Sequence, residues 1–109
     1  MRVVKNLVKT MQEEQKRSVY YYRVVKGVRM GVQAFGIEIE RLDMEGEDII
    51  NIERNSVECI SPQPHKVYDL LNILYNNLVS PLHLVDIIGE YVDLYIVDFD
   101  NDFQCIATN

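Results

Sequence analysis

The chain has 109 residues, 48% of them hydrophobic and 26% charged, and a formal net charge of −6 at pH 7. This length suits one domain with a real core, and the composition excludes an intrinsically disordered chain. No apolar run is long enough to span a bilayer, and no signal-peptide pattern follows the basic N-terminus. The two cysteines, Cys59 and Cys105, have no metal-ligand spacing, so we expect reduced thiols in a cytoplasmic protein.

The two parts of the chain carry charges of opposite sign. Residues 1–30 hold eight basic and two acidic side chains, whereas residues 31–109 hold three basic and fifteen acidic ones. Such an asymmetry predicts a dipolar surface, which steers partners or favours self-association between opposite charges. Exposed charges are screened by salt, so we expect a dimer that weakens as salt rises.

The N-terminal segment, residues 1–16, fits two structures. Val4, Leu7 and Met11 have the spacing of a helix, whereas Leu7, Lys9 and Met11 alternate as they would in a strand. Its secondary structure therefore stays open between helix and strand.

Two strands are expected next, over residues 18–26 and 32–42. The first is rich in valine and tyrosine, which suit a pleated surface, and the second alternates apolar and acidic side chains from Phe35 to Glu40. Glycines separate or interrupt these strands. They match neither a dinucleotide fingerprint nor a phosphate loop, and we interpret them as turn or bulge residues: Gly27, Gly31 and Gly36.

A further strand is expected at about residues 50–59, completing the strand region 18–60. Its apolar positions change parity between Ile52 and Val57, and we interpret this change as a bulge near Asn55 and Ser56.

The segment 61–99 has the pattern of two amphipathic helices, each begun by a Ser-Pro pair. Serine caps a helix and proline suits its first position, so Ser61 and Ser80 are the expected caps. The first helix should bury Val67, Leu70, Leu71, Leu74 and Leu78. The second should bury Leu84, Val85, Ile88, Tyr91, Val92 and Tyr95. A short connection predicts an antiparallel hairpin, with an acidic tail at 100–109.

Together these elements predict an α+β fold. Strands joined by tight turns pair antiparallel, so we expect a sheet of three to four strands covered by the C-terminal two-helix hairpin.

Three stretches carry a resemblance to a known family: Gly36-Ile-Glu-Ile-Glu40, the Ile60-Ser-Pro62 entry to the first helix, and Ser80-Pro-Leu-His-Leu-Val-Asp-Ile-Ile-Gly-Glu-Tyr-Val-Asp93. Over about residues 18–96, the chain resembles a family of short Gram-positive bacterial proteins described only as a domain of unknown function. The resemblance implies a bacterial cytoplasmic origin. It implies no activity, cofactor or site residue.

No catalytic, metal or cofactor site is expected. The spacing of Asp98, Asp100 and Asp102 resembles a calcium loop, but Phe103 replaces the glycine of the turn and Asn109 replaces the final glutamate. His83 has the chemistry of a base near neutrality, but a position in the first helical turn indicates a surface residue.

Two candidate binding surfaces remain. The acidic one comprises Asp86, Glu90, Asp93, Asp98, Asp100 and Asp102. The basic and aromatic one, on which nucleic-acid bases would stack, comprises Lys16, Arg17, Tyr20, Tyr21, Tyr22, Arg23, Lys26 and Arg29.

These surfaces favour a small acidic protein-interaction or regulatory module without catalytic activity, with a protein partner or a second copy bound to it. One alternative is an inhibitor whose carboxylates imitate nucleic-acid phosphates. Another is a nucleotide or nucleic-acid binder that uses the tyrosine-rich strand. No membrane partner is expected.

Overall fold

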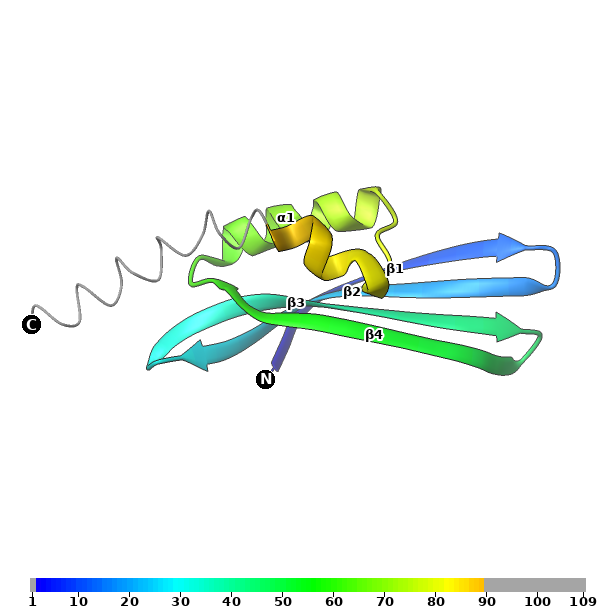
Figure 1. Cartoon of the computed structure of the whole chain (residues 1–109), viewed down its shortest axis with the longest axis horizontal. Helices are drawn as coiled ribbons and strands as arrows, with labels where there is room; N and C mark the ends of the chain where they lie inside the picture. The colour runs from blue at the N-terminus through cyan, green and yellow to red at the C-terminus, as the bar shows by residue number, and fades with distance from the viewer. Residues whose placement is uncertain (1, 90–109) are drawn as a thin grey trace, which may run out of the picture.

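A computed structural model describes residues 2–89 of the chain. Four strands form one sheet: β1 (Arg2–Glu13), β2 (Lys16–Arg29), β3 (Val32–Glu45) and β4 (Asp48–Ser61). Each strand pairs antiparallel with the next, in the order β1-β2-β3-β4. Helix α1 (Pro64–Asn76) and the 3-10 turn η1 (Pro81–His83), which continues as a helix over 84–89, lie on the same face of the sheet (Figure 1). The predicted α+β class is confirmed.

Strand β1 settles the structure of the N-terminal segment. Leu7 packs against the core, and the lysines on either side of it contact α1. The Lys9 Nζ donates a hydrogen bond to the Tyr75 carbonyl at 2.9 Å, and the Lys5 Nζ lies 5.2 Å from the Tyr68 ring centroid. Lys5 and Lys9 occupy positions that face the helix, where apolar residues would be expected, so the sequence of β1 does not show a clear strand alternation.

Two-residue turns close the three hairpins of the sheet. In the turn between β2 and β3, both Met30 and Gly31 have positive φ values, of 50° and 80°. Two consecutive positive φ values are the mark of a type I′ turn, whose twist matches that of the paired strands.

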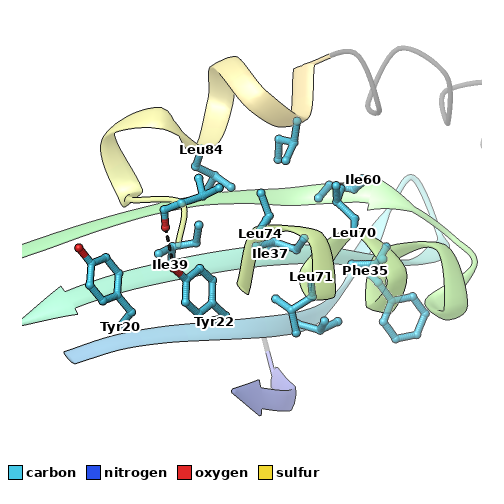
Figure 2. Packing of buried hydrophobic residues seen from close by; sticks show 14 residues of the cluster. Tyr20, Tyr22, Phe35, Ile37, Ile39, Ile60, Leu70, Leu71, Leu74 and Leu84 are labelled. Atoms are coloured by element: carbon cyan, nitrogen blue, oxygen red, sulfur yellow. Dashed lines mark hydrogen bonds between the residues drawn. The ribbon is translucent and has the colours of Figure 1, made fainter. Parts of the chain in front are cut away.

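The core lies between the sheet and the helices (Figure 2). The sheet contributes Tyr20, Tyr22, Val24, Phe35, Ile37, Ile39 and Ile60, and the helical layer contributes Val67, Leu70, Leu71, Leu74, Val79, Leu84 and Ile88. The buried Tyr22 hydroxyl donates a hydrogen bond to the Val79 carbonyl at 2.9 Å. Burial, with smaller effects from Tyr20 and Tyr75, raises the pKa of Tyr22, so this hydroxyl keeps its proton.

The start of the first helix differs from the prediction. Ser61 is the last residue of β4, and α1 begins at Pro64 after the extended residue Gln63. A residue that precedes proline is disfavoured in the helical region, so Pro64 forces Gln63 out of the helix. The Ser61 hydroxyl instead accepts a hydrogen bond from the Gln63 backbone N–H at 3.1 Å.

The second helical segment begins after Ser80, with Pro81 as its first residue, as predicted, but the Ser80 side chain makes no capping hydrogen bond. Its buried residues include Leu84 and Ile88, but Val85 is 53% exposed, so its assignment to the stripe is wrong. Residue 85 lies about 100° around the helix from residue 84, which turns its side chain away from the sheet. The other three stripe residues, Tyr91, Val92 and Tyr95, lie outside the described residues.

The stripe of the first helix is confirmed except at its end. Val67, Leu70, Leu71 and Leu74 are buried. Leu78 is only half-buried and lies beyond the helix, with a positive φ of 51°. Because α1 ends at Asn76, Leu78 is not part of the buried face of the helix.

The bulge predicted near Asn55 and Ser56 is also wrong, because these two residues pair regularly with β3. Two irregularities flank them. Near the start of β4, one residue of β3, from Met44 to Asp43, is matched by two of β4, from Ile49 to Asn51; near its end, β3 passes from Ile37 to Phe35 while β4 advances from Val57 to Ser61. Gly36 lies opposite these extra residues of β4. A Cβ atom there would overlap the backbone carbonyl oxygens of Val57 and Glu58, so a long-range backbone contact explains this glycine.

Candidate interaction surface

The sheet has a second face, opposite to the helices, which we call the open face. The strand registers place its side chains in rows that cross all four strands. The first row is Asn6, Arg23, Glu38 and Ser56; the second is Val8, Tyr21, Glu40 and Arg54; the third is Thr10, Val19, Leu42 and Ile52. Among residues 2–89, both helical segments lie on the other face, so these rows form a surface of the described structure (Figure 1).

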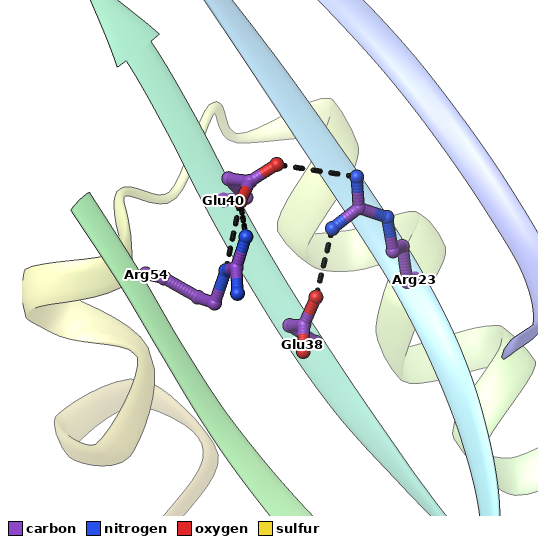
Figure 3. Close-up of polar contacts among 4 residues, drawn as sticks. All are labelled: Arg23, Glu38, Glu40 and Arg54. Carbon is purple, nitrogen blue, oxygen red and sulfur yellow. Dashed lines mark hydrogen bonds and ion pairs between the residues drawn. The ribbon is translucent and has the colours of Figure 1, made fainter. Parts of the chain in front are cut away.

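Charged side chains from three strands form a connected array on the open face (Figure 3). Arg23 donates to the Glu38 Oε1 at 2.7 Å and to the Glu40 Oε1 at 3.3 Å. Arg54 donates to the Glu40 Oε2 through Nε at 2.7 Å and also through Nη2. One carboxylate is thus held between two guanidinium groups, which fixes the geometry of all three side chains.

Glu40 is only 7% exposed although it lies on the open face. Burial alone would raise the pKa of Glu40, but hydrogen bonds from Arg54 and Arg23 outweigh it and hold the pKa below its usual range. The carboxylate is therefore ionised at neutral pH, and the array presents fixed charges.

Apolar side chains border the charged array. Leu42 and Val19 are half-buried in the third row, and Ile52 at the end of this row is 58% exposed. In the second row Val8 is 47% exposed, and the Arg23 guanidinium lies 4.9 Å from the Tyr21 ring centroid. A preorganised charge array beside exposed aliphatic carbon is a combination suited to binding a protein surface.

A hollow of about 350 Å³ lies at the end of the sheet that carries the β1–β2 and β3–β4 turns. Its lining includes Met11, Tyr20 and Leu78, together with Asp43. The Asp43 carboxylate accepts hydrogen bonds from Ser18 at 2.7 Å, Arg41 at 2.8 Å and Asn51 at 3.1 Å. Burial opposes ionisation of Asp43, but these three donors lower its pKa. They also occupy its oxygens, so Asp43 itself has little hydrogen-bonding capacity left for a ligand.

The structure divides the basic and aromatic surface that the sequence suggested. Tyr20 and Tyr22 lie in the core, stacked with their ring centroids 6.2 Å apart. Tyr21, Arg17 and Arg23 occupy open-face positions.

The other three basic residues lie nearer the two ends of β2, and of these only Arg29 shares the open-face alternation of Arg23. Lys16 is exposed at the start of β2, whereas Lys26 and Arg29 are half-buried near its end. The surface is therefore not continuous, and Arg23 is already paired with two carboxylates.

The acidic surface is described only at Asp86, which is exposed in the helix that follows η1. The remaining members, Glu90, Asp93, Asp98, Asp100 and Asp102, lie outside the described residues. His83, considered as a base, is exposed in η1.

Sequence reasoning missed the partners that organise the open face: Glu38, Glu40 and Arg54. The alternation of Ile37 and Ile39 with the two glutamates did place both carboxylates on one face. Arg54 could not be assigned to this group from its local pattern, because it becomes a neighbour of Glu40 only through the register of β3 and β4.

No helix within residues 2–89 has the length and apolar character needed to cross a membrane. In the same part of the chain, no three His, Cys, Asp or Glu side chains are grouped as metal ligands would be.

A family model covers residues 1–94, which include the whole sheet and both described helical segments. No curated protein and no solved structure matches the chain. The family is described as a family of unknown function, so it brings no activity to the open face. The extent of the match shows that the chain belongs to this family, DUF6514.

Proposed function

We propose that this chain is a small protein-interaction or regulatory module without catalytic activity, and that it binds its partner through the open face. The observation that carries the proposal is the preorganised Arg23–Glu40–Arg54 array next to half-exposed aliphatic side chains. The setting we propose is the cytoplasm of a Gram-positive bacterium, where Cys59 is a reduced thiol.

The array supports recognition of a polar protein surface. Ion pairs within one chain fix the charged groups before binding, so a partner does not have to order them. Ile52 and Val8, at opposite edges of the open face, supply apolar area, and Leu42 and Tyr21 supply more between them. A partner would therefore need an aliphatic patch beside charged or amide groups.

The nucleic-acid alternative has less support from the geometry. Base stacking needs exposed rings beside uncommitted cations. Tyr21 is the one member of the Tyr20–Tyr22 run on the open face, and the Arg23 charge beside it is balanced by Glu38 and Glu40.

The phosphate-imitating inhibitor remains a second candidate, because exposed carboxylates meet at one end of the sheet. The registers align Glu13, Glu45 and Asp48 across the strands, with Lys16 between them. In this case the partner would be a basic protein that handles nucleic acid, and DNA or RNA would compete with the chain for it.

Partner capture from the native cytoplasm tests the proposal when it is made with matched variants. The open-face variant is Tyr21→Ser with Leu42→Ser, which removes apolar area but no charge. The control is Ile73→Ser with Val85→Ser, which removes exposed apolar area from the helical layer. We expect wild type and control to retain the same partner in stoichiometric amount, and the open-face variant to lose it while keeping its circular dichroism spectrum.

Equal capture by the open-face variant would contradict the use of this face. A partner displaced by DNA, retained by both serine variants and lost after Glu45→Lys with Asp48→Lys, would establish the inhibitor instead.

A further inference from the structure

The two edges of the sheet form a second pair of surfaces. β1 and β4 are its outer strands, of 12 and 14 residues. Within residues 2–89, each has one neighbouring strand, so the backbone N–H and C=O groups on its outer side have no strand partner in the described structure. Such an edge is a template for another strand, and soluble proteins usually protect it.

Six of the twelve exposed large apolar side chains among residues 2–89 lie on these edge strands. Val3, Val8 and Met11 of β1 are 51%, 47% and 42% exposed. On β4 the exposed apolar residues are Ile49, Ile50 and Ile52, at 53%, 52% and 58%. The sequence of β4 contains neither lysine nor proline, which are the residues that commonly block edge pairing.

The charges of the two edges are complementary. β1 carries three basic side chains and one acidic one, Glu13, so its net charge is plus two. β4 carries one basic side chain, Arg54, and three acidic ones, so its net charge is minus two. Pairing β1 with β1, or β4 with β4, opposes like charges, whereas pairing β1 with β4 joins opposite ones.

Resting on the proposed function, we propose that copies of the chain associate through these edges, with β1 of one copy paired antiparallel to β4 of the next. In a sheet of four antiparallel strands, the two outer strands run in opposite directions. Two copies in the same orientation therefore continue one antiparallel sheet, with all helices on one side and the open faces joined on the other. The contact is head to tail, so each copy offers one edge of each kind.

In this pairing, the electrostatic contact between copies involves other acidic residues than those expected from the sequence. The acidic partner surface becomes Asp48, Glu53 and Glu58 of β4, in place of the helix that carries Asp86. The basic side of the contact is β1. Lys9 and Lys5 are held beside Tyr75 and Tyr68, which fixes their charge near this edge.

Charge exchange between the edges tests the pairing. The first variant changes the net charge of β1 from plus two to minus two. It carries three substitutions at exposed positions, Arg2→Glu, Asn6→Glu and Thr10→Glu. Asp48→Lys with Glu58→Lys, also exposed, change the net charge of β4 from minus two to plus two. By sedimentation velocity at low salt, wild type should associate and then dissociate as salt is raised. Each variant alone should be monomeric, and an equimolar mixture of the two should associate again.

The mixing step separates this pairing from its rivals. A two-fold contact between β4 strands would leave the β1 variant as associated as wild type, and that result would overturn the proposal. Loss of association on Asp86→Lys alone, equal to the loss in the edge variants, would return the contact to the helix and also overturn it. A wild type that stays monomeric at high micromolar concentration and low salt would overturn it as well. None of these outcomes affects the capture of a partner by the open face, which depends on Tyr21 and Leu42.

Discussion

The two faces of the sheet are built from alternate residues of the same strands, yet they differ in what holds them together. On the covered face, Tyr22, Ile37 and Ile39 are fully buried against leucines of the helical layer. On the open face, the neighbours Tyr21, Glu38 and Glu40 meet guanidinium groups and solvent. Burial of apolar area stabilises a fold far more than exposed ion pairs do. The covered face therefore supplies most of the stability, and the fold places fewer demands on the composition of the open face, as the proposed binding role requires.

The largest loss of stability is expected from a cavity in the covered face. Leu74→Ala removes a fully buried side chain of α1 and should lower the free energy of unfolding by about 2 to 5 kcal/mol, as measured by urea denaturation. The control is Leu82→Ala at a position that is 75% exposed, where the change should stay within about 0.5 kcal/mol. Equal effects at the two sites would mean that α1 does not form the core.

The next effect concerns the backbone contact that bends β4. Gly36→Ala places a methyl group against the carbonyl oxygens of Val57 and Glu58, and should cost stability at the upper end of the roughly 1 to 3 kcal/mol typical of overpacking. Gly89→Ala is a matched control, because nothing lies near that site and alanine favours a helix, so the free energy of unfolding should rise slightly. Hydrogen exchange should quicken around residues 57–61 in the first variant. A stable Gly36→Ala protein with unchanged exchange would show that the strands do not approach closely there.

These two sites also show how far the sequence could be read. The leucine stripe of α1 follows from local spacing, and the alternation in β2 and β3 predicts their strands. The bend near Gly36 depends on Val57 and Glu58, which are far away in the chain, and local parity placed it at the wrong residues. β1 stayed ambiguous for a different reason: Lys5 and Lys9 face the helical layer, where apolar residues are expected.

The candidate surface could be read only in part, for the same reason. Alternation places Arg23 and Tyr21 on one face and buries Tyr22 between them on the other. The partners of Arg23 come from β3, and the second guanidinium on Glu40 comes from β4. The two-residue turn between β2 and β3 sets the register that places Arg23 opposite Glu38. In the next hairpin an irregularity between Asp43 and Met44 shifts the register by one residue, which brings Arg54 opposite Glu40, and the local sequence does not mark this shift.

A substitution on the open face should lower the free energy of unfolding by less than Leu74→Ala or Gly36→Ala, and the size of its effect should depend on pH. The pKa of Glu40 is lower in the folded state than in the unfolded chain, so its contribution is present above the unfolded pKa and is lost as pH falls through the folded pKa. Glu40→Gln should cost on the order of 1 kcal/mol at pH 7, because charge-assisted bonds to Arg23 and Arg54 are weakened.

The pH dependence of the stability of Glu40→Gln isolates the contribution of the Glu40 charge. The difference in unfolding free energy between wild type and Glu40→Gln should shrink as the pH falls below about 4.3, the reference pKa of glutamate. Parallel denaturation series from pH 7 to pH 3 measure this difference. A constant gap across the series would show that the charge of Glu40 does not contribute. Asp43 remains present in both proteins, so its own lowered pKa cancels from the comparison.

The smallest expected effect lies at the rim of the covered face, where Lys9 brings a charge beside the apolar core. Its ammonium group donates to the Tyr75 carbonyl at 2.9 Å and lies 4.6 Å from the Tyr75 ring centroid, next to the C-terminal end of α1. A cation there adds a second hydrogen bond to a carbonyl that already accepts one from the Leu78 backbone N–H at 3.3 Å, and it opposes the negative end of the helix dipole. Lys9→Met keeps most of the aliphatic stem and removes the charge, so it should cost about 0.5 to 1 kcal/mol. Lys9→Arg keeps the charge and should recover most of this loss. Thermal unfolding at low and at high salt distinguishes the contributions, because a dipole contribution shrinks with salt whereas the packing of the stem does not. A loss equal in both variants and insensitive to salt would show that Lys9 acts by shape alone, as the apolar residues of the covered face do.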